Sequence, residues 1–165
     1  MMTPLLCFTM EEAWTTRFGT NESVHLHRFL KTPAEWANEV LLEKWARLRE
    51  LRRVVTGALE VKRAAKEIGA SLEAKPTLYV EDPEDAALFA DVDLGEIAIT
   101  SGAQVVVGKA PADAFRLPDA PGVAVVFAHA EGRKCARCWM VLPEVGSNPG
   151  HPDLCKRCSN AVGPS

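Results

Sequence analysis

Four of the five cysteines form two pairs near the end of the chain, and their spacing suits metal binding. Two residues separate the cysteines within each pair, and sixteen residues separate the pairs. This spacing lets both sulfurs of a pair point into one turn, and two such turns can enclose one ion in a tetrahedron of thiolates. The pattern predicts a structural zinc site with no open position for catalysis, and its ligands are Cys135, Cys138, Cys155 and Cys158.

The remaining cysteine and the histidines offer weaker alternatives. Disulfides would need an oxidising compartment, which nothing in the sequence indicates, and a redox pair would leave the second pair unexplained. His151 stands four residues before Cys155 and could replace one ligand. His25 and His27 alternate as on one strand face, but no third ligand lies nearby in the sequence. Cys7 lies in an apolar run and is expected in a core or an interface.

A tryptophan and several cations accompany the first cysteine pair. Trp139 follows Cys138 directly, and Arg133, Lys134 and Arg137 stand just before it. The indole either forms the small core of the finger or presents a face on which an unpaired base can stack. The cations would favour a polyanion, and they would also offset the negative charge of four thiolates around one Zn²⁺. No set of residues typical of an enzyme active site accompanies them.

Composition sets limits on the class of protein. The 165 residues are 47% hydrophobic and 25% charged, as in an ordinary globular protein, with a net charge of −3. No apolar run is long enough for a membrane span, so we expect a cytoplasmic protein with no membrane partner. Residues 44–66 hold eight basic and two acidic side chains, whereas residues 67–96 hold nine acidic and one basic. The basic segment is either a surface for a polyanion or a solvated helix face.

The elements that would position these residues follow from apolar periodicity. Residues 33–68 carry an apolar stripe at helical spacing, and Gly69 is expected to end the helix. An earlier helix runs through Trp14 and begins with a capping box at Thr9. The pattern then changes and predicts a short helix at 83–90, with strands at 76–81, 97–100, 103–107 and 123–129. The expected fold class is α+β: a long amphipathic helix, a small α/β unit and a zinc ribbon or finger.

Several stretches resemble the C-terminal part of bacterial isoleucyl-tRNA synthetases. Residues 52–74 and 4–14 are similar to helices of the family's anticodon-binding domain, and residues 23–26 are similar to its following loop. Residues 131–139 and 154–158 resemble its terminal zinc finger, which valyl and leucyl relatives usually lack. Ile99-Thr100-Ser101-Gly102-Ala103 is a shorter, less specific match. The resemblance covers nearly the whole chain, which is therefore expected to be a piece of a longer protein.

The resemblance implies a role in holding the anticodon stem-loop of isoleucine tRNA, in partnership with the remainder of the synthetase chain. The family's H-I-G-H and K-M-S-K-S signatures are absent from this sequence. ATP would therefore belong to a separate catalytic domain, and this chain alone is expected to be inactive. The RNA-binding residues that the resemblance and the charge pattern suggest are Arg52, Arg63, Lys66, Lys134, Arg137, Trp139 and Arg157. By helical angle Arg52 also lies in the apolar stripe, so an internal ion pair with an acid competes for it.

The expected domains are 1–74, the end of the anticodon-binding helical domain, 75–130, a small connecting α/β unit, and 131–160, the four-cysteine finger. An alternative is a free-standing zinc-finger protein that binds nucleic acid or acts as an adaptor. Its finger would resemble that of formamidopyrimidine-type DNA glycosylases. Those enzymes use an N-terminal proline followed by glutamate, whereas this chain begins Met1-Met2-Thr3.

Overall fold

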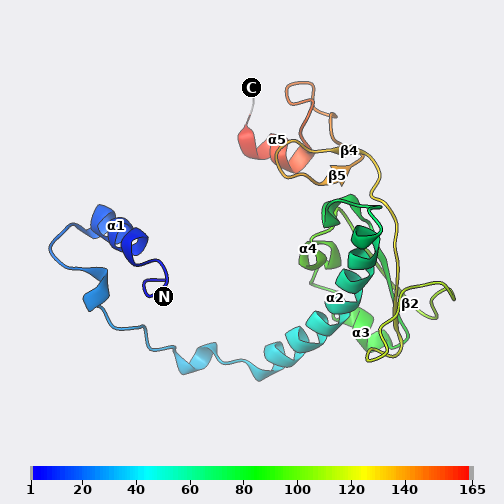
Figure 1. The fold of residues 1–165 in the computed structure, drawn as a ribbon, viewed down its shortest axis with the longest axis horizontal. Coiled ribbons are helices and arrows are strands. Elements are labelled where there is room, and N and C mark those ends of the chain that lie inside the picture. The colour runs from blue at the N-terminus through cyan, green and yellow to red at the C-terminus, as the bar shows by residue number, and fades with distance from the viewer. Residues whose placement is uncertain (1, 164–165) are drawn as a thin grey trace. The chain divides into compact units, whose positions relative to one another are not determined.

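The computed structural model describes residues 2–163 and divides into two compact units, Met1–Glu39 and Val40–Ser165. The first unit holds helix α1 (Cys7–Phe18) and two single-turn 3-10 helices, Val24–Leu26 and Ala34–Trp36 (Figure 1). Glu11 accepts hydrogen bonds from the Ser23 hydroxyl and the Val24 amide and so fastens the first 3-10 helix to α1. The predicted capping box is wrong: α1 begins two residues before Thr9, and no side chain caps it.

Helix α2 (Glu39–Ala64) is shorter than the sequence pattern predicts. Pro33 precedes a 3-10 turn instead of the helix, and Lys66, with φ of 60°, reverses the backbone before Gly69 is reached. The C-terminal half of the expected apolar stripe, including Leu48 and Leu59, is buried. Leu41 and Trp45, in the N-terminal half, remain 48% and 36% exposed.

A three-stranded sheet forms the centre of the second unit. Its strands are β1 (Thr77–Val80), β2 (Gln104–Val107) and β3 (Val123–Val126), in the order β2-β1-β3. β1 pairs with β2 in parallel and with β3 antiparallel. The parallel pair requires a crossover, which α3 (Pro83–Ala87) and α4 (Leu94–Ala98) supply.

The predicted strand at 97–100 is wrong because Ile97 and Ala98 form the end of α4 and Ile99 caps it. Asp93 accepts hydrogen bonds from the amides of Gly95 and Glu96 and so caps the helix. Ile99 then ends α4 in the left-handed conformation, with φ of 58° and ψ of 51°. The β-branched composition of this stretch is therefore overridden by a capped turn.

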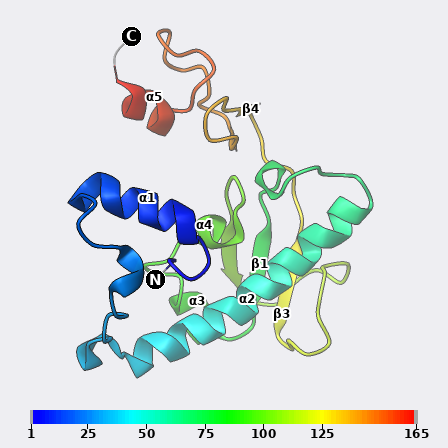
Figure 2. The ribbon, with the colours of Figure 1, turned by 60° about the vertical axis from the view of Figure 1, so that its left-hand side comes forward.

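Helix α2 packs across the sheet (Figure 2) and builds one apolar core with it. Leu51 and Val55 from α2 join Leu78 and Val125 from the strands in this core. In the part of the chain that the structure describes, no helix combines the length and apolarity needed to cross a membrane.

The C-terminal finger has a separate small core. It consists of β4 (Arg133–Lys134) and β5 (Val141–Leu142), which form a hairpin, and helix α5 (Lys156–Val162). The buried residues of its apolar core are three of the paired cysteines and Val145. Helices, a small sheet and a cysteine finger confirm the predicted α+β class, whereas the three-domain division stays a prediction.

Candidate metal centre and nucleic-acid interface

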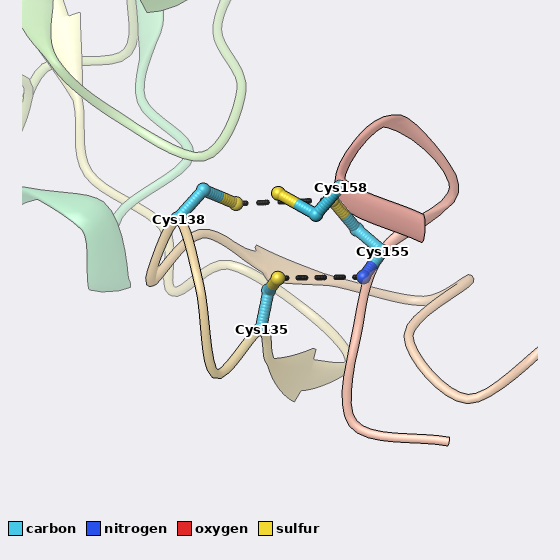
Figure 3. A group of neighbouring side chains, drawn as sticks. All are labelled: Cys135, Cys138, Cys155 and Cys158. Atoms are coloured by element: carbon cyan, nitrogen blue, oxygen red, sulfur yellow. Dashed lines mark hydrogen bonds between the residues drawn. The ribbon is translucent and has the colours of Figure 1, made fainter. Parts of the chain in front are cut away.

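The structure gathers the four paired cysteines at one point of the finger (Figure 3). Cys135 and Cys138 come from the turn between β4 and β5, while Cys155 precedes α5 and Cys158 lies in its first turn. The four sulfurs all lie within 4.8 Å of one another, and those of Cys138 and Cys155 are 3.7 Å apart. Segments separated by sixteen residues thus converge as the sequence spacing predicts.

This arrangement fits zinc. A Zn–S distance of about 2.3 Å places neighbouring sulfurs of a tetrahedron roughly 3.8 Å apart, close to the observed spacing. Three of the four cysteines are buried and the fourth is half-buried, so the surroundings would exclude water from the ion. His151 is not a member of this cluster, since its ring bonds the Gly163 carbonyl at 2.9 Å. His25 and His27 lie near Glu11 and Glu22 in the other unit.

Backbone amides, a guanidinium group and burial shift the pKa values of the cysteine thiols. Burial raises the pKa of Cys135, but hydrogen bonds from the amides of Cys138, Cys155 and Arg137 outweigh it and lower the pKa to about 6. The Arg137 guanidinium, 3.6 Å from the Cys158 sulfur, lowers the pKa of that thiol. Burial raises the pKa of Cys155 to about 12. The cluster therefore favours thiolate at some positions before any ion binds.

Trp139 points outward from the turn that carries the first two cysteines. Its side chain is 61% exposed, and its φ of 67° is left-handed. The Lys134 ammonium lies 5.4 Å from the centre of its ring. This exposure excludes the interpretation of Trp139 as the core of the finger, which the cysteines and Val145 provide.

The hairpin beside this turn depends on one glycine. A Cβ atom on Gly132 would lie 2.3 Å from the carbonyl carbon of Leu142, and its φ of 112° is unfavourable for other residues. The close approach of the two strands thus requires glycine at this position.

The predicted RNA-binding cations fall into different environments. Lys134, Arg137 and Arg157 are exposed on the finger, and Arg157 approaches the Met140 sulfur at 3.7 Å. Arg63 pairs with Glu60, and Lys66 is exposed just beyond the end of α2.

Arg52 faces inward, as its helical angle predicts, but not to an acid. Its Nε donates to the carbonyl of Ile97 at 2.5 Å, and the side chain is half-buried. This bond satisfies a carbonyl in the last turn of α4 and ties that helix to α2.

Ion pairs between α2 and the acidic segment were not anticipated from sequence. Arg47 makes two bonds to Asp85, at 2.7 and 2.6 Å, and Lys44 pairs with Asp91. The hydrogen bonds that Arg47 donates to the Asp85 carboxylate, a residue only 6% exposed, raise the pKa of the Arg47 guanidinium. The opposite charges of 44–66 and 67–96 were the available signal. Much of the basic charge on α2 is therefore compensated within the chain.

The sequence marks Ser101 only as part of the short familial match at residues 99–103, and it predicts no contact for this side chain. Ser101 is buried, and its hydroxyl bridges Leu72 to Val141 of the finger. Those partners are 29 and 40 residues away, so local sequence carries no signal for this contact.

Comparison with known proteins accounts for both the helical part and the finger. A family described as the anticodon-binding domain of tRNA ligase matches residues 1–78, and one described as the zinc finger found in FPG and IleRS matches residues 132–161. The isoleucine–tRNA ligase of Mesorhizobium japonicum is 51% identical over 94% of this chain and 16% of its own length. Those of Ruegeria pomeroyi and Brucella abortus are 52% and 48% identical, each over 98% of the chain and 17% of their own length.

The chain is similar to isoleucine–tRNA ligases along nearly its whole length. It matches a C-terminal part of these ligases and spans about a sixth of the length of the relatives cited. The finger alone is shared with another family, but the match to isoleucine–tRNA ligases extends through the helices and the sheet. A glycosylase-type or free-standing finger does not account for that continuous similarity.

Proposed function

We propose that this chain is a tRNA-binding part of an isoleucine–tRNA ligase and that it holds the anticodon stem-loop of isoleucine tRNA. The observation that carries the proposal is the continuous similarity to isoleucine–tRNA ligases, with the anticodon-binding family matched over residues 1–78. In this proposal the rest of the ligase chain supplies ATP-dependent aminoacylation, and the complete enzyme works in the cytoplasm.

The finger is proposed to hold one structural Zn²⁺ through Cys135, Cys138, Cys155 and Cys158. With all four positions taken by sulfur, the ion would have no site for substrate and would act through folding. Such an ion contributes on the order of 10 kcal/mol to a stretch with little core of its own. The finger fits this description, since Val145 is its one buried non-cysteine apolar residue among those described.

The proposed RNA surface of the finger consists of Lys134, Arg137, Trp139 and Arg157. An exposed indole flanked by cations suits an unpaired loop base, because every base has a face that stacks and every nucleotide carries a phosphate. Their exposure on one small module supports this role.

On the helix, Arg63 and Lys66 are the proposed RNA contacts. Arg63 lies in the last turn of α2 and Lys66 lies just beyond its end. Arg63 could exchange Glu60 for a phosphate at small cost because the pair is exposed. Arg52 is the exception among the expected contacts. Its bond to Ile97 supports a role in holding α4 rather than in touching RNA.

Binding to three RNAs tests the proposal. The 165-residue chain, loaded with zinc, is titrated into isoleucine tRNA, the same tRNA with a changed anticodon, and an unrelated tRNA across a salt series. Tighter binding to isoleucine tRNA than to the other two is expected. Equal affinity for all three would overturn anticodon recognition, and no binding at all would favour the adaptor alternative.

A further inference from the structure

The finger and the sheet domain do not share an apolar core. The core of α2 and the sheet and the core around the cysteines are separate clusters. Between them lies a hollow of about 430 Å³, lined by Ile99 and Glu96 on one side and by Met140 and Arg157 on the other. Apolar packing therefore contributes little to fixing the orientation of the finger, and polar contacts must do so.

Two sets of backbone and side-chain bonds join these parts. The segment at residues 128–130, which connects the sheet to the finger, runs beside residues 73–75, where the amide of Ala130 donates to the Glu73 carbonyl and the amide of Lys75 donates to the Ala128 carbonyl. Beyond this segment, Ser101 reaches the finger itself. Its hydroxyl accepts from the amide of Val141 in β5 at 2.7 Å and donates to the carbonyl of Leu72 at 2.5 Å.

Water cannot easily take over the two hydrogen bonds that the Ser101 hydroxyl makes. Ser101 is only 8% exposed, and both its donor and an acceptor position are used. An alanine would leave the Leu72 carbonyl and the Val141 amide without this partner. The two atoms belong to different parts of the unit, so the bridge acts as a fixed point between them.

The turn that carries Ser101 is itself held from several directions. Arg52 bonds the carbonyl of Ile97, the Thr100 hydroxyl bonds the carbonyl of Gly102, and the Ser101 amide donates to Ala74. Ile99 enters the turn in the left-handed region, which is a marked outlier for a β-branched residue. Strain of this kind persists where the surroundings over-determine the backbone, and it is concentrated at functional positions.

We infer that Ser101 is a positioning residue that locks the finger to the sheet domain, so that the finger and the end of α2 can engage one RNA together. This inference rests on the proposed function. With the orientation fixed, the second contact is made within an already formed complex and gains a high effective concentration. With a loose finger, part of that gain is lost even though no RNA-contacting side chain has changed.

The test compares Ser101→Ala with Ser159→Ala in the zinc-loaded chain. Ser159 is a matched control because it is also buried and its hydroxyl bonds Asn148 within the finger. Zinc content is measured first for both variants and should equal that of the unaltered chain. Amide exchange at Val141 and ¹⁵N relaxation of the finger then report the joint without any RNA present.

We expect Ser101→Ala to speed exchange at Val141 and to give the finger a shorter rotational correlation time than the sheet domain. We expect its affinity for isoleucine tRNA to fall by about tenfold, whereas Ser159→Ala keeps both properties. Unchanged relaxation in Ser101→Ala would overturn the claim that Ser101 fixes the finger to the sheet domain. A mobile finger with unchanged affinity would overturn the claim that this fixed orientation supports RNA binding. Failure of the unaltered chain to prefer isoleucine tRNA would instead overturn the proposed function, and the relaxation result would still decide the joint.

Discussion

The ammonium of Lys134 lies over the ring of Trp139, 5.4 Å from its centre, on the exposed side of the finger. A cation at this position adds to the binding of a nucleotide, since the ammonium can contact the phosphate of a nucleotide whose base stacks on the indole. The pair therefore combines the two contacts that single-stranded RNA offers, a base face and a charge.

Replacing Trp139 by alanine should weaken binding of isoleucine tRNA by about 1–3 kcal/mol, the usual value of one stacked base. Zinc content should stay the same because the indole is exposed rather than packed on the cysteines. Trp139→Phe keeps an aromatic face and should retain most of the affinity. Loss of zinc in the alanine variant would show that the indole supports the finger instead.

Replacing Cys155 by serine should release the proposed ion, because the hydroxyl is a poor substitute for a buried thiolate ligand. Elemental analysis and hydrogen exchange across residues 132–161 measure the effect, and exchange should rise throughout the finger. Cys7→Ser is the control, since Cys7 is exposed and lies outside the cluster. Unchanged zinc content in the Cys155 variant would contradict the four-cysteine site.

The zinc affinity should rise with pH, but less steeply than for four ordinary thiols. Cys135, with a pKa of about 6, is largely deprotonated at pH 7 and adds little pH dependence above it. Cys155, with a pKa of about 12, must release its proton to the solvent when its sulfur binds the ion, so its contribution to affinity increases as pH rises. Competition with a chelator from about pH 7 to 8.5 should show fewer protons released per ion than the four that fully protonated thiols would lose. A release of four protons would mean that all four thiols are still protonated before the ion binds.

Variants of Lys66 and Arg52 should have opposite effects on stability and on the salt dependence of tRNA binding. Lys66→Gly removes an exposed charge at a left-handed position that glycine tolerates, so stability should hold while tRNA affinity falls and the salt slope decreases by about one. Arg52→Ala should lower the free energy of unfolding by roughly 1–2 kcal/mol through the lost bond to Ile97, with the salt slope retained. A reduced salt slope in the Arg52 variant would identify it as an RNA contact after all.

Asp85→Asn should destabilise the protein because Asp85 is nearly buried and receives two bonds from Arg47. Arg47 is partly exposed and water can solvate it, so we expect a loss of about 1–2 kcal/mol in denaturant unfolding. The double variant Arg47→Met with Asp85→Asn should lose less than the sum of the single changes. Additive losses would show that the two side chains do not stabilise the fold as a pair.

The parts of the structure that the sequence predicted are those encoded by nearby residues. The cysteine finger follows from two short spacings, and the strands at 77–80, 104–107 and 123–126 from β-branched runs. The helix ends were wrong where a backbone angle decided them, as at Lys66, whose side chain gives no hint of a left-handed conformation. The prediction of a strand at 97–100 was wrong because capping by Asp93 outweighed the strand preference of Ile97 and Ile99.

Long-range contacts were the least predictable part of the candidate site. Ser101 bridges positions on both sides of it in the chain, and no periodic pattern marks such a residue. The pairing of Arg47 with Asp85 was more accessible, since two adjacent segments of opposite charge can compensate each other when they fold together. Exposed Trp139 could not be distinguished from a core residue until the cysteines themselves were seen to fill the core.

The left-handed backbone of Trp139 also has a consequence for directed evolution. A bulky residue in that region costs roughly 1–2 kcal/mol relative to glycine, which adopts it without strain. A selection for heat resistance alone would therefore favour Trp139→Gly, while a selection for tRNA binding would remove it. Opposite enrichment of one substitution under two selections is the signature of a side chain retained for what it touches rather than for what it stabilises.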